Sequence, residues 1–390
     1  MCGIIGYIGD KPAAPILLQG LRRLEYRGYD SAGMAIQHGA TMARIRALGK
    51  IENLATCLKT ETIPGTVGIA HTRWATHGGV TKENAHPHTG CHEKLAIVHN
   101  GIIENYREIK EHLGDTHTYE SETDSEILAH LIEEHFHSMD AKDSVDALRL
   151  AVEQALTHVR GTYGIAVMHK DIPNCVIAAR MGSPLVIGIG ENEHYIASDA
   201  TPLLVHTKKV IYLEDGEIAQ ITKDEIHTFT LQDDEVEKCV EEIEWDDEQA
   251  QKQGFDHFLI KEIHDQPTVF KDAIRGRYNV EDGTAHLGGL NMTIKEMQSI
   301  NRVILIACGT ASYAGMIGKY AFERLAGIPA EVDVASEFRY RDPVLDKHTL
   351  VFAISQSGET ADTLAALREA KRKGAFVRGV VNVIGSTIAR

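Results

Sequence analysis

Hydrophobic positions at the start of the chain form one short strand-like run and then recur at helical spacing. The run "CGIIGYIG" follows Met1, and "PAAPILLQGLRRLEYRG" comes after it with Ile16, Leu17, Leu21 and Leu24 on one helical face. Gly28 marks the end of this segment, because glycine favours helix termination. The pattern predicts a strand followed by a helix.

Two further helices are predicted before residue 160. The stretch "SETDSEILAHLIEEHF" places Thr123 and Glu126 at the spacing of a capping box, in which each side chain binds the backbone N–H of the other residue. An apolar stripe at helical spacing follows them. The third helix is expected from about Asp143 to Val159.

From Tyr163 to about Thr230 the pattern changes to short apolar runs with a period of two. The runs are "YGIAVMH", "NCVIAAR", "PLVIGIG", "HYIASD" and "KVIYLEDGEIAQIT". Within the last of them, the pair Asp215-Gly216 predicts a β-hairpin turn. Because strands and helices occupy separate blocks, we expect an α+β layered domain with largely antiparallel sheets.

An acidic stretch poor in apolar residues, "QDDEVEKCVEEIEWDDEQAQKQ", divides the chain. Beyond it, "RVILIACGTASYAG", "AEVDVASEF", "LVFAISQSGETADTLAALREAKRKG" and "FVRGVVNVIG" alternate buried strands with helices, which is typical of a parallel α/β sheet. We therefore predict a first domain over residues 1–230, an acidic linker over 231–255 and an α/β domain over 256–390.

Composition and charge exclude several classes of function. A chain of 390 residues with 43% apolar and 25% charged residues fits two or three globular domains. Its net charge of −16 argues against a surface that binds nucleic acid. No apolar run approaches the length of about 20 residues that crosses a bilayer, and no basic segment precedes an apolar one at the N-terminus. We expect a cytoplasmic protein with neither a nucleic-acid nor a membrane partner.

Cys2 is the cysteine whose position indicates a catalytic role. The six cysteines show no CxxC pair and no regular spacing, so neither a zinc site nor a disulfide framework is predicted. Removal of Met1 by methionine aminopeptidase leaves Cys2 with a thiol and a free α-amine. Such a residue is a nucleophile that carries its own base.

Several polar motifs accompany this cysteine, namely "EYRGYDSAG", "HTRWATHGG", "NAHPHTG", "VHNGIIENY" and "SETD". Each mixes residues that allow tight turns with polar residues that are costly to bury unpaired. Taken singly, each has a structural interpretation. Arg73 fits a surface ion pair, Asp124 a helix cap, and Asn100-Gly101 a hairpin turn.

Together with Cys2, these motifs resemble the N-terminal nucleophile class of glutamine amidotransferases over the first 230 residues. They occur in the order and at the approximate spacing of that family. The resemblance implies the four-layer αββα fold of the N-terminal nucleophile hydrolases, as in class II glutamine amidotransferases.

The resemblance also assigns catalytic roles. The Cys2 thiolate attacks the side-chain amide of glutamine, and the Cys2 α-amine, with an ordinary pKa of about 7.7 to 8.0, accepts and returns the proton. The Asn100 side chain and the Gly101 N–H supply the donors for the tetrahedral oxyanion.

Further positions are implied to bind glutamine or to line the site. The resemblance implies that Arg73 binds the α-carboxylate of glutamine and that Asp124 binds its α-ammonium group. It also implies that Thr76 and His77 line the same pocket. Arg27 belongs to the loop beside the cysteine, and Trp74 resembles the gate of an ammonia passage.

The stretch "NAHPHTGCH" places His86, His88, Cys91 and His92 close together. No known zinc spacing fits them well, and glutamine hydrolysis by a cysteine needs no metal. We expect structural histidines with satisfied hydrogen bonds, no metal site and no cofactor.

In the second domain, two stretches follow buried strands with a turn rich in hydroxyl groups and then a helix. The loop "SQSGETADT" can present Ser355, Gln356, Ser357 and Thr360 at a helix N-terminus, a geometry that suits a phosphate. An ordinary capped helix after a strand explains that loop equally well. The stretch "ILIACGTASYAG" repeats the plan, with Thr310 and Ser312 in the corresponding turn.

The two loops closely resemble the sugar isomerase (SIS) domain that binds sugar phosphates. With the glutaminase domain in front, they resemble enzymes that hydrolyse L-glutamine, pass the ammonia to fructose 6-phosphate, and release glucosamine 6-phosphate and glutamate. That family tends to form homodimers. One position departs from its pattern, because Ala311 stands where the family commonly has serine.

In the family, the sequence continues beyond the position of Arg390 through the rest of the SIS domain and a second one. We therefore expect the α/β domain to be truncated, the glutaminase half to be intact and the synthase half to be inactive. Two alternatives remain: another class II glutamine amidotransferase, such as the one that makes phosphoribosylamine, or a sugar-phosphate sensor with a relic glutaminase domain.

Overall fold

The computed structural model describes residues 2–61, 63–75, 77–139, 144–243, 255, 257–281, 283–285, 287–383 and 386–390. The chain divides into two compact units, residues 1–251 and 252–390. Among the described residues, no helix is both long and apolar enough to span a membrane.

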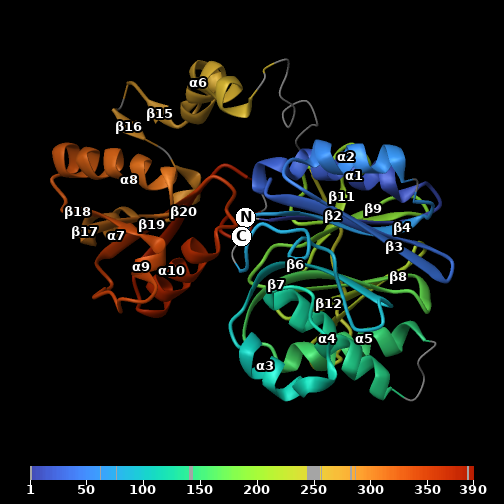
Figure 1. Cartoon of the computed structure of the whole chain (residues 1–390). Coiled ribbons are helices and arrows are strands. Elements are labelled where there is room, and N and C mark those ends of the chain that lie inside the picture. The colour runs from blue at the N-terminus through green and yellow to red at the C-terminus, as the bar shows by residue number, and fades with distance from the viewer. Residues whose placement is uncertain are drawn as a thin grey trace. The chain divides into compact units, whose positions relative to one another are not determined.

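Two antiparallel sheets form the centre of the first unit (Figure 1). The larger sheet has the strand order β14-β11-β9-β10-β1-β4-β2-β3, and the smaller has the order β13-β12-β8-β7-β6-β5. The strands are β1 (Gly3–Ile8), β2 (Ser31–His38), β3 (Thr41–Leu48), β4 (Val67–Arg73), β5 (His88–Thr89), β6 (Leu95–Ile103), β7 (Gly161–His169), β8 (Ile172–Met181), β9 (Val186–Ile189), β10 (His194–Ala197), β11 (Lys209–Tyr212), β12 (Glu217–Ile221), β13 (Ile226–Thr230) and β14 (Glu241–Glu242).

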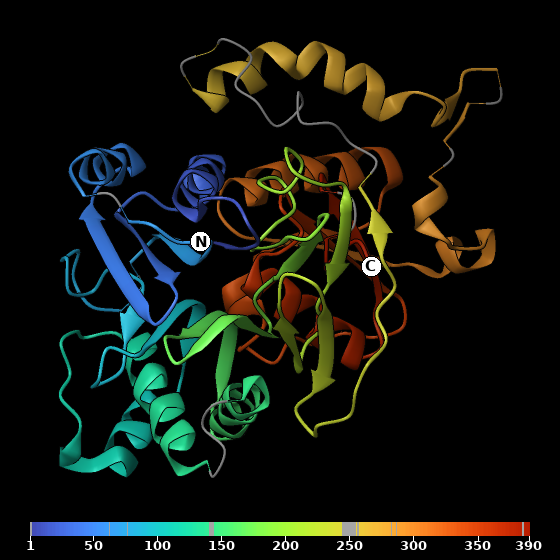
Figure 2. The same cartoon turned by 90° about the vertical axis from the view of Figure 1, so that its right-hand side faces the viewer.

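Helices cover the outer face of each sheet, which gives four layers (Figures 1 and 2). Helices α1 (Ala13–Leu24) and α2 (Ile51–Thr60) pack on the larger sheet, and α4 (Asp124–Ser138) and α5 (Val145–Thr157) pack on the smaller one. Helix α3 (Tyr106–Leu113) packs against α4. The predicted αββα fold is thus confirmed.

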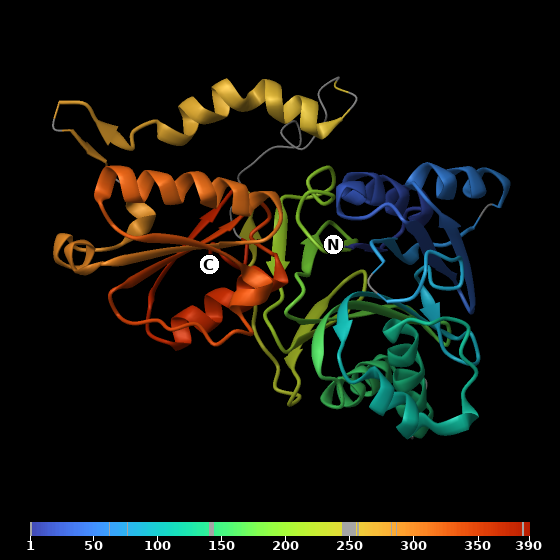
Figure 3. The same cartoon turned by 60° about the vertical axis from the view of Figure 1, so that its left-hand side comes forward.

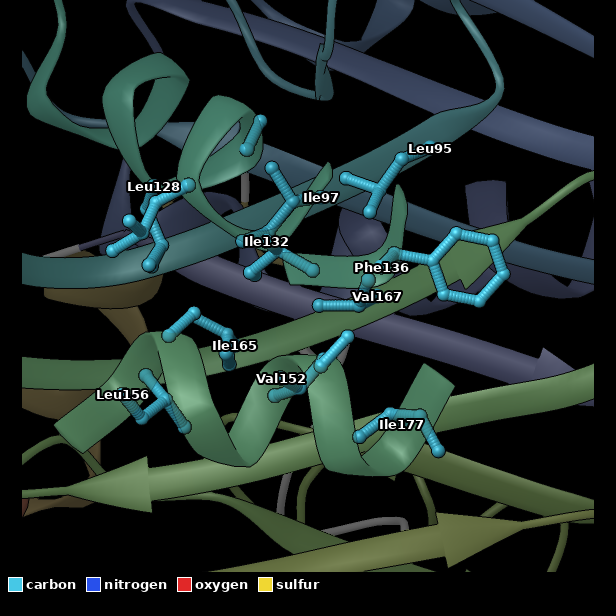
Figure 4. Packing of buried hydrophobic residues seen from close by; sticks show 14 of the residues in the cluster. Leu95, Ile97, Leu128, Ile132, Phe136, Val152, Leu156, Ile165, Val167 and Ile177 are labelled. Atoms are coloured by element: carbon cyan, nitrogen blue, oxygen red, sulfur yellow. The ribbon is translucent and has the colours of Figure 1, made fainter. Parts of the chain in front are cut away.

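Successive side chains of a strand point to opposite faces of the sheet, so the near-continuous apolar runs of these strands are buried on both faces. In β6, Leu95 and Ile97 join the apolar cluster under α4 and α5, whereas Ala96 and Val98 join the cluster between the two sheets. Figure 4 shows the outer cluster, in which Leu128 and other side chains of α4 and α5 meet the strands.

The helix predictions agree with the structure except for one cap. The first helix, α1, ends before Gly28, α4 begins after Thr123, and α5 begins at Val145, while Asp143 lies outside the described residues. Thr123 Oγ1 accepts a hydrogen bond from Glu126 N–H at 3.3 Å. The reciprocal half of the capping box was predicted wrongly, because the Glu126 carboxylate instead accepts the N–H groups of Glu120 and Ser121 at 2.7 Å each.

The predicted hairpin at Asp215-Gly216 was wrong. Gly216 has the positive φ of 85° that such a turn needs. However, β11 before the turn pairs within the larger sheet and β12 after it pairs within the smaller one. Asp215 Oδ1 accepts the Gly182 N–H at 2.8 Å, which fixes the turn as a crossing between sheets. Turn chemistry therefore predicted the bend but not the partner of the returning strand.

Residues that the sequence assigned to the acidic linker extend the first unit. Strand β14 pairs with β11, with Lys209 opposite Glu242 and Val210 opposite Glu241. Residues 244–254 lie outside the described residues.

The second unit contains the predicted parallel sheet, with the strand order β18-β17-β19-β20. Figure 3 shows α8 on one face of this sheet and α9 and α10 on the other. The strands are β15 (Tyr278–Asn279), β16 (Thr284–Ala285), β17 (Arg302–Ala307), β18 (Ala330–Val334), β19 (Thr349–Ser355) and β20 (Phe376–Val381). The helices are α6 (Phe258–Ile274), α7 (Ile294–Ser299), α8 (Thr310–Ala321), α9 (Ala335–Phe338) and α10 (Ala361–Arg372).

Truncation of Leu128 is expected to destabilise the first unit. Its side chain is fully buried between α4 and the smaller sheet, so Leu128→Ala removes apolar contacts and leaves a cavity. We expect a loss of about 2–5 kcal/mol in the free energy of unfolding, measured by urea denaturation with circular dichroism. Leu48→Ala, at a position that is 42% exposed, should cost less than about 1 kcal/mol. Equal losses in the two variants would contradict the described packing.

Candidate active site

Strand pairing places Cys2 beside Arg73 and Trp74. Strand β1 runs antiparallel to β4, with Gly3 opposite Thr72, so the residue before β1 meets the C-terminal end of β4. There the Trp74 N–H donates to Cys2 Sγ at 3.2 Å, and the Cys2 thiol lies 3.5 Å from the Trp74 carbonyl oxygen. The indole of Trp74 is 45% exposed and packs edge-on against Tyr29.

The surroundings of Cys2 hold its sulfur in the thiol form. Burial raises the pKa of the Cys2 thiol above its ordinary value, although the Trp74 N–H and the charges of Arg73 and Arg27 act in the opposite direction. Attack by this sulfur therefore requires a base that removes its proton.

Arg27 fixes the backbone of Cys2. Its Nε donates to the Cys2 carbonyl oxygen at 3.1 Å, and its guanidinium group pairs with Asp199 Oδ2 at 2.8 Å. Arg27 is only 4% exposed, so removal of either member of this pair would leave a buried charge unpaired. The expected position of Arg27 beside the cysteine agrees with this arrangement.

Asn100 reaches the same backbone carbonyl from the smaller sheet. Its Nδ2 donates to the Cys2 carbonyl oxygen at 3.3 Å, and its Oδ1 lies 3.0 Å from His71 Nε2. Burial lowers the pKa of His71 to about 3, so the ring is neutral at pH 7. A neutral ring that donates from Nε2 fixes the amide of Asn100 with its Nδ2 turned toward Cys2.

His71 is a positioning residue to which the sequence interpretation gave no role. It lies in "HTRWATHGG", one of the motifs that resemble those of the glutamine amidotransferases. The signal in the sequence was a histidine that directly follows the apolar run "VGIA". Its partner, Asn100, comes from another sheet, and only the tertiary structure reveals it.

Gly101 and Asp124 are joined to Asn100 through β6. Gly101 has a φ of 142°, and a Cβ atom at this position would collide with the Thr162 carbonyl oxygen. Two residues further along β6, the Ile103 N–H donates to Asp124 Oδ2 at 2.8 Å. Asp124 is the first residue of α4, where the helix dipole favours a negative charge.

Arg73 organises the loop after β4. Its guanidinium group donates to the carbonyl oxygens of His77 and Gly79, the latter at 3.0 Å, and it is 3% exposed. Asp30 Oδ2 accepts the Ala75 N–H at 2.7 Å and holds the same loop. The ring of His77 lies edge-on to Tyr106.

Most of the expected glutaminase residues therefore converge on one end of the two sheets. Direct hydrogen bonds join Cys2 to Arg27, Trp74 and Asn100, and Arg73 lies next to Trp74 in the chain. Gly101 and Asp124 follow along β6 and α4. Thr76 lies outside the described residues.

The histidines of "NAHPHTGCH" separate into different environments. His88 Nε2 lies 3.1 Å from Thr123 Oγ1, and burial lowers the pKa of His88 to about 3. Neither ring nitrogen of His86 has a hydrogen-bond partner among the described residues. The expectation of a satisfied histidine is therefore wrong for His86. His92 is exposed, and Cys91 lies beside His117 and His130 instead.

The two loops of the second unit lie at one edge of its sheet. Because β17 and β19 are parallel neighbours, the loops that follow them meet where the strand order reverses, which is the usual ligand crevice of such sheets. The Thr363 hydroxyl approaches Cys308 Sγ at 3.8 Å and links the helix of one loop to the other loop.

Hydroxyl groups in these loops shape the turns. Ser355 Oγ accepts the Gly358 N–H at 3.0 Å and lies 3.2 Å from Thr360 Oγ1, and Ser357 Oγ accepts the Glu359 N–H at 3.2 Å. Ser312 donates to the Gly309 carbonyl oxygen at 2.7 Å within its own turn. Gln356 is exposed, and Thr310 is the first residue of α8.

Family models match parts of both units. Residues 71–205 match the glutamine amidotransferase domain, and residues 296–390 match the SIS domain. The chain thus carries a glutamine amidotransferase domain followed by an SIS domain.

Curated relatives extend this similarity to the whole chain. The chain is 52% identical to the glutamine–fructose-6-phosphate aminotransferase (isomerizing) of Chlorobaculum tepidum, 49% to that of Thermus thermophilus and 45% to that of Methanosarcina mazei. Each alignment covers 100% of this chain and 63% of the relative. By sequence, the chain is a relative of the glutamine–fructose-6-phosphate aminotransferases and spans 63% of their length.

Solved structures support the fold. A glutamine phosphoribosylpyrophosphate amidotransferase from B. subtilis covers 98% of this chain and 81% of its own, with 17% identity and a TM-score of 0.52. The structure of the allosteric regulatory enzyme of purine biosynthesis covers 98% of this chain and 80% of its own, with 20% identity and a TM-score of 0.53.

Acid should destabilise the first unit through its buried histidines. His71 and His88 have a pKa of about 3 when folded and about 6.5 when unfolded, so the unfolded state binds more protons between these values. Stability is therefore fully present above pH 6.5 and is lost as the pH falls toward 3. Each histidine should cost about 2 kcal/mol at pH 5, measured by urea denaturation.

A pair of variants isolates the contribution of His71. His71→Gln should lose about 2 kcal/mol less than the parent protein between pH 7 and pH 5, because it has no imidazole to protonate. His92→Gln, at an exposed position, should keep the parent's dependence on pH. An unchanged slope in His71→Gln would show that the buried ring does not titrate as described.

Proposed function

We propose that the first unit hydrolyses L-glutamine at Cys2. The observation that carries this proposal is the convergence of Cys2 with Asn100, Trp74 and Arg27 at the end of β1, next to the buried Arg73. Cleavage of the side-chain amide of an amino acid requires a nucleophile and a hydrogen-bond donor for the oxyanion, and a cation can bind the α-carboxylate. Groups of these three kinds lie next to each other here.

The Cys2 thiol is the nucleophile of the proposed reaction. Its pKa is raised by burial, so the proton must pass to a base as the sulfur attacks the side-chain carbonyl of glutamine. The α-amine of Cys2, free once Met1 has been removed, is within the same residue and titrates near neutral pH. It then returns the proton to the leaving ammonia, and water releases glutamate from the thioester.

The tetrahedral oxyanion would be stabilised by Asn100 and Gly101. The Asn100 Nδ2 already points to the Cys2 backbone, because His71 holds the other end of the amide. Donors that are fixed before the reaction need no reorganisation when the charge develops. Arg73 would bind the α-carboxylate of the substrate, and Asp124 its α-ammonium group; Thr76 and His77 complete the proposed pocket.

We further propose that the ammonia serves the synthesis of glucosamine 6-phosphate from fructose 6-phosphate in the cytoplasm, within a homodimer of the full-length enzyme. The named activity of relatives with 45–52% identity supports this assignment over synthesis of phosphoribosylamine. The crevice after β17 and β19, with Thr310, Ser312, Ser355, Gln356, Ser357 and Thr360, would receive the sugar phosphate. Exclusion of water protects ammonia from protonation during transfer.

Replacement of the nucleophile tests the glutaminase directly. Cys2→Ala should reduce glutamate release from glutamine to the rate without enzyme, because no other group forms the thioester. Glutamate is measured by a coupled dehydrogenase assay, and intact mass establishes that Met1 has been removed. Cys239→Ala, at an exposed cysteine, should keep full activity. Glutamate release that survives in Cys2→Ala would refute the proposed nucleophile.

Two variants should separate transition-state stabilisation from substrate binding. Asn100→Ala should lower kcat about 10²- to 10³-fold with little effect on KM, because the oxyanion forms only during the reaction. Arg73→Lys should raise KM roughly 10- to 100-fold, because a lysine cannot bind a carboxylate with two parallel hydrogen bonds.

Exposed positions supply the controls for this pair. Asn53→Ala and Arg22→Lys should leave both kinetic parameters unchanged, since both side chains are exposed and neither takes part in the described hydrogen bonds of Cys2. A rise in KM without a fall in kcat for Asn100→Ala would assign Asn100 to substrate binding instead of oxyanion stabilisation.

A further inference from the structure

Four side chains with metal-ligating atoms meet on the smaller-sheet side of the first unit, at a place that the proposed glutaminase does not use. Cys91 lies in the turn between β5 and β6, His117 directly follows the helical turn Gly114–Thr116 between α3 and α4, and His130 and Glu133 lie on α4. Their ligating atoms all lie within 4.8 Å of one another. His130 and Glu133 are buried, whereas Cys91 lies at the surface.

The ligating atoms of Cys91, His117 and His130 form a triangle with the dimensions of a metal site. Cys91 Sγ lies 3.5 Å from His117 Nδ1 and 3.4 Å from His130 Nδ1, and the two nitrogens lie 3.2 Å apart. Tetrahedral Zn²⁺ with ordinary bond lengths requires about 3.6 Å between sulfur and nitrogen and about 3.4 Å between two nitrogens. Each observed distance agrees with these values to within roughly 0.2 Å.

Both imidazole rings also have carboxylates on their outer side. His117 Nε2 lies 3.8 Å from Glu134 Oε2, and His130 Nε2 lies 4.0 Å from Glu126 Oε1. Both separations exceed hydrogen-bonding distance, and His130 Nε2 has no hydrogen-bond partner among the described residues. The two carboxylates therefore add negative charge near the rings, which favours a cation between them, but they do not fix the tautomers. The Glu126 carboxylate is itself held by the backbone N–H groups of Glu120 and Ser121.

The carboxylate of Glu133 faces the same place from the interior. Its two carboxylate oxygens accept the N–H groups of Cys91 and His92 at 2.7 and 3.2 Å, so the carboxylate and the cysteine turn are already held together. Each oxygen has a second lone pair that remains available to a cation.

We propose that Cys91, His117, His130 and Glu133 bind one Zn²⁺ ion. A thiolate, two imidazoles and a carboxylate favour zinc over Mg²⁺ or Ca²⁺, which prefer oxygen ligands only. With four protein ligands the site is closed, so its role is structural. It connects the turn between β5 and β6 to α4, the helix whose first residue is Asp124.

The experiment measures metal binding by the whole chain and does not depend on glutaminase activity. Protein purified without chelator is analysed for zinc by mass spectrometry, and metal-free protein is titrated with Zn²⁺ and with Co²⁺. We expect one Zn²⁺ per chain and, with Co²⁺, the absorption bands of tetrahedral thiolate-bound cobalt. In Cys91→Ser, zinc affinity should fall roughly tenfold or more and the thiolate band should disappear.

Controls keep the result interpretable if a variant folds poorly. Cys239→Ser, at another exposed cysteine, should bind Zn²⁺ like the parent protein. His117→Ala removes a side chain that is only partly buried, and circular dichroism should show that this variant remains folded while it loses zinc. Absence of stoichiometric Zn²⁺ both after purification and after titration would overturn the proposal and leave a hydrogen-bonded cluster. Zinc binding that persists in Cys91→Ser and His117→Ala would also overturn it.

Discussion

The pairing of β1 between β10 and β4 is the constraint on which the candidate active site depends. This pairing sets Gly3 opposite Thr72 and so brings Cys2 to the end of β4, where Arg73 and Trp74 lie. A slip of one residue would turn every side chain of β1 to the other face of the sheet. The register is well determined, because β1 places Ile5 and Tyr7 in the outer cluster and Ile4 and Ile8 between the sheets. The burial of side chains on both faces of β1 therefore fixes the position of Cys2, the proposed nucleophile.

Polar groups that cross between the two sheets complete the site. Asn100 comes from the smaller sheet and His71 from the larger, and their hydrogen bond lies in a buried region where a charged ring would be costly. The low pKa of His71 follows from that burial, and it keeps the ring in the neutral form that can position an amide. The same apolar interior that stabilises the four layers thus determines the protonation state of the residue behind Asn100.

Much of the fold and of the site follows from local sequence signals, and most of the failures concern contacts between distant segments. Helical spacing, strand periodicity and the motifs around Arg73, Asn100 and Asp124 are local patterns, and the structure brings these residues to one end of the first unit. The hairpin at Asp215-Gly216, the reciprocal cap by Glu126 and the satisfied state of His86 were predicted wrongly. The Glu126 carboxylate binds the N–H groups of Glu120 and Ser121, which lie close to it in the sequence. The hairpin and the state of His86 depend on which distant segment lies beside the residue, and a local pattern does not contain that information. His71 and the group around Cys91 escaped notice for the same reason.

Helix α4 connects the candidate active site to the proposed zinc site. Asp124 at its first turn accepts the Ile103 N–H from β6, and His130 and Glu133, two turns further along, face the turn that carries Cys91. A metal ion at that turn would fix the position of α4 along the smaller sheet, in addition to the apolar contacts of Leu128 and Ile132. Because a helix moves as a rigid element, a shift at His130 would also displace the carboxylate of Asp124. The zinc site would thus hold in place a residue that is proposed to bind glutamine, although no zinc ligand touches the substrate.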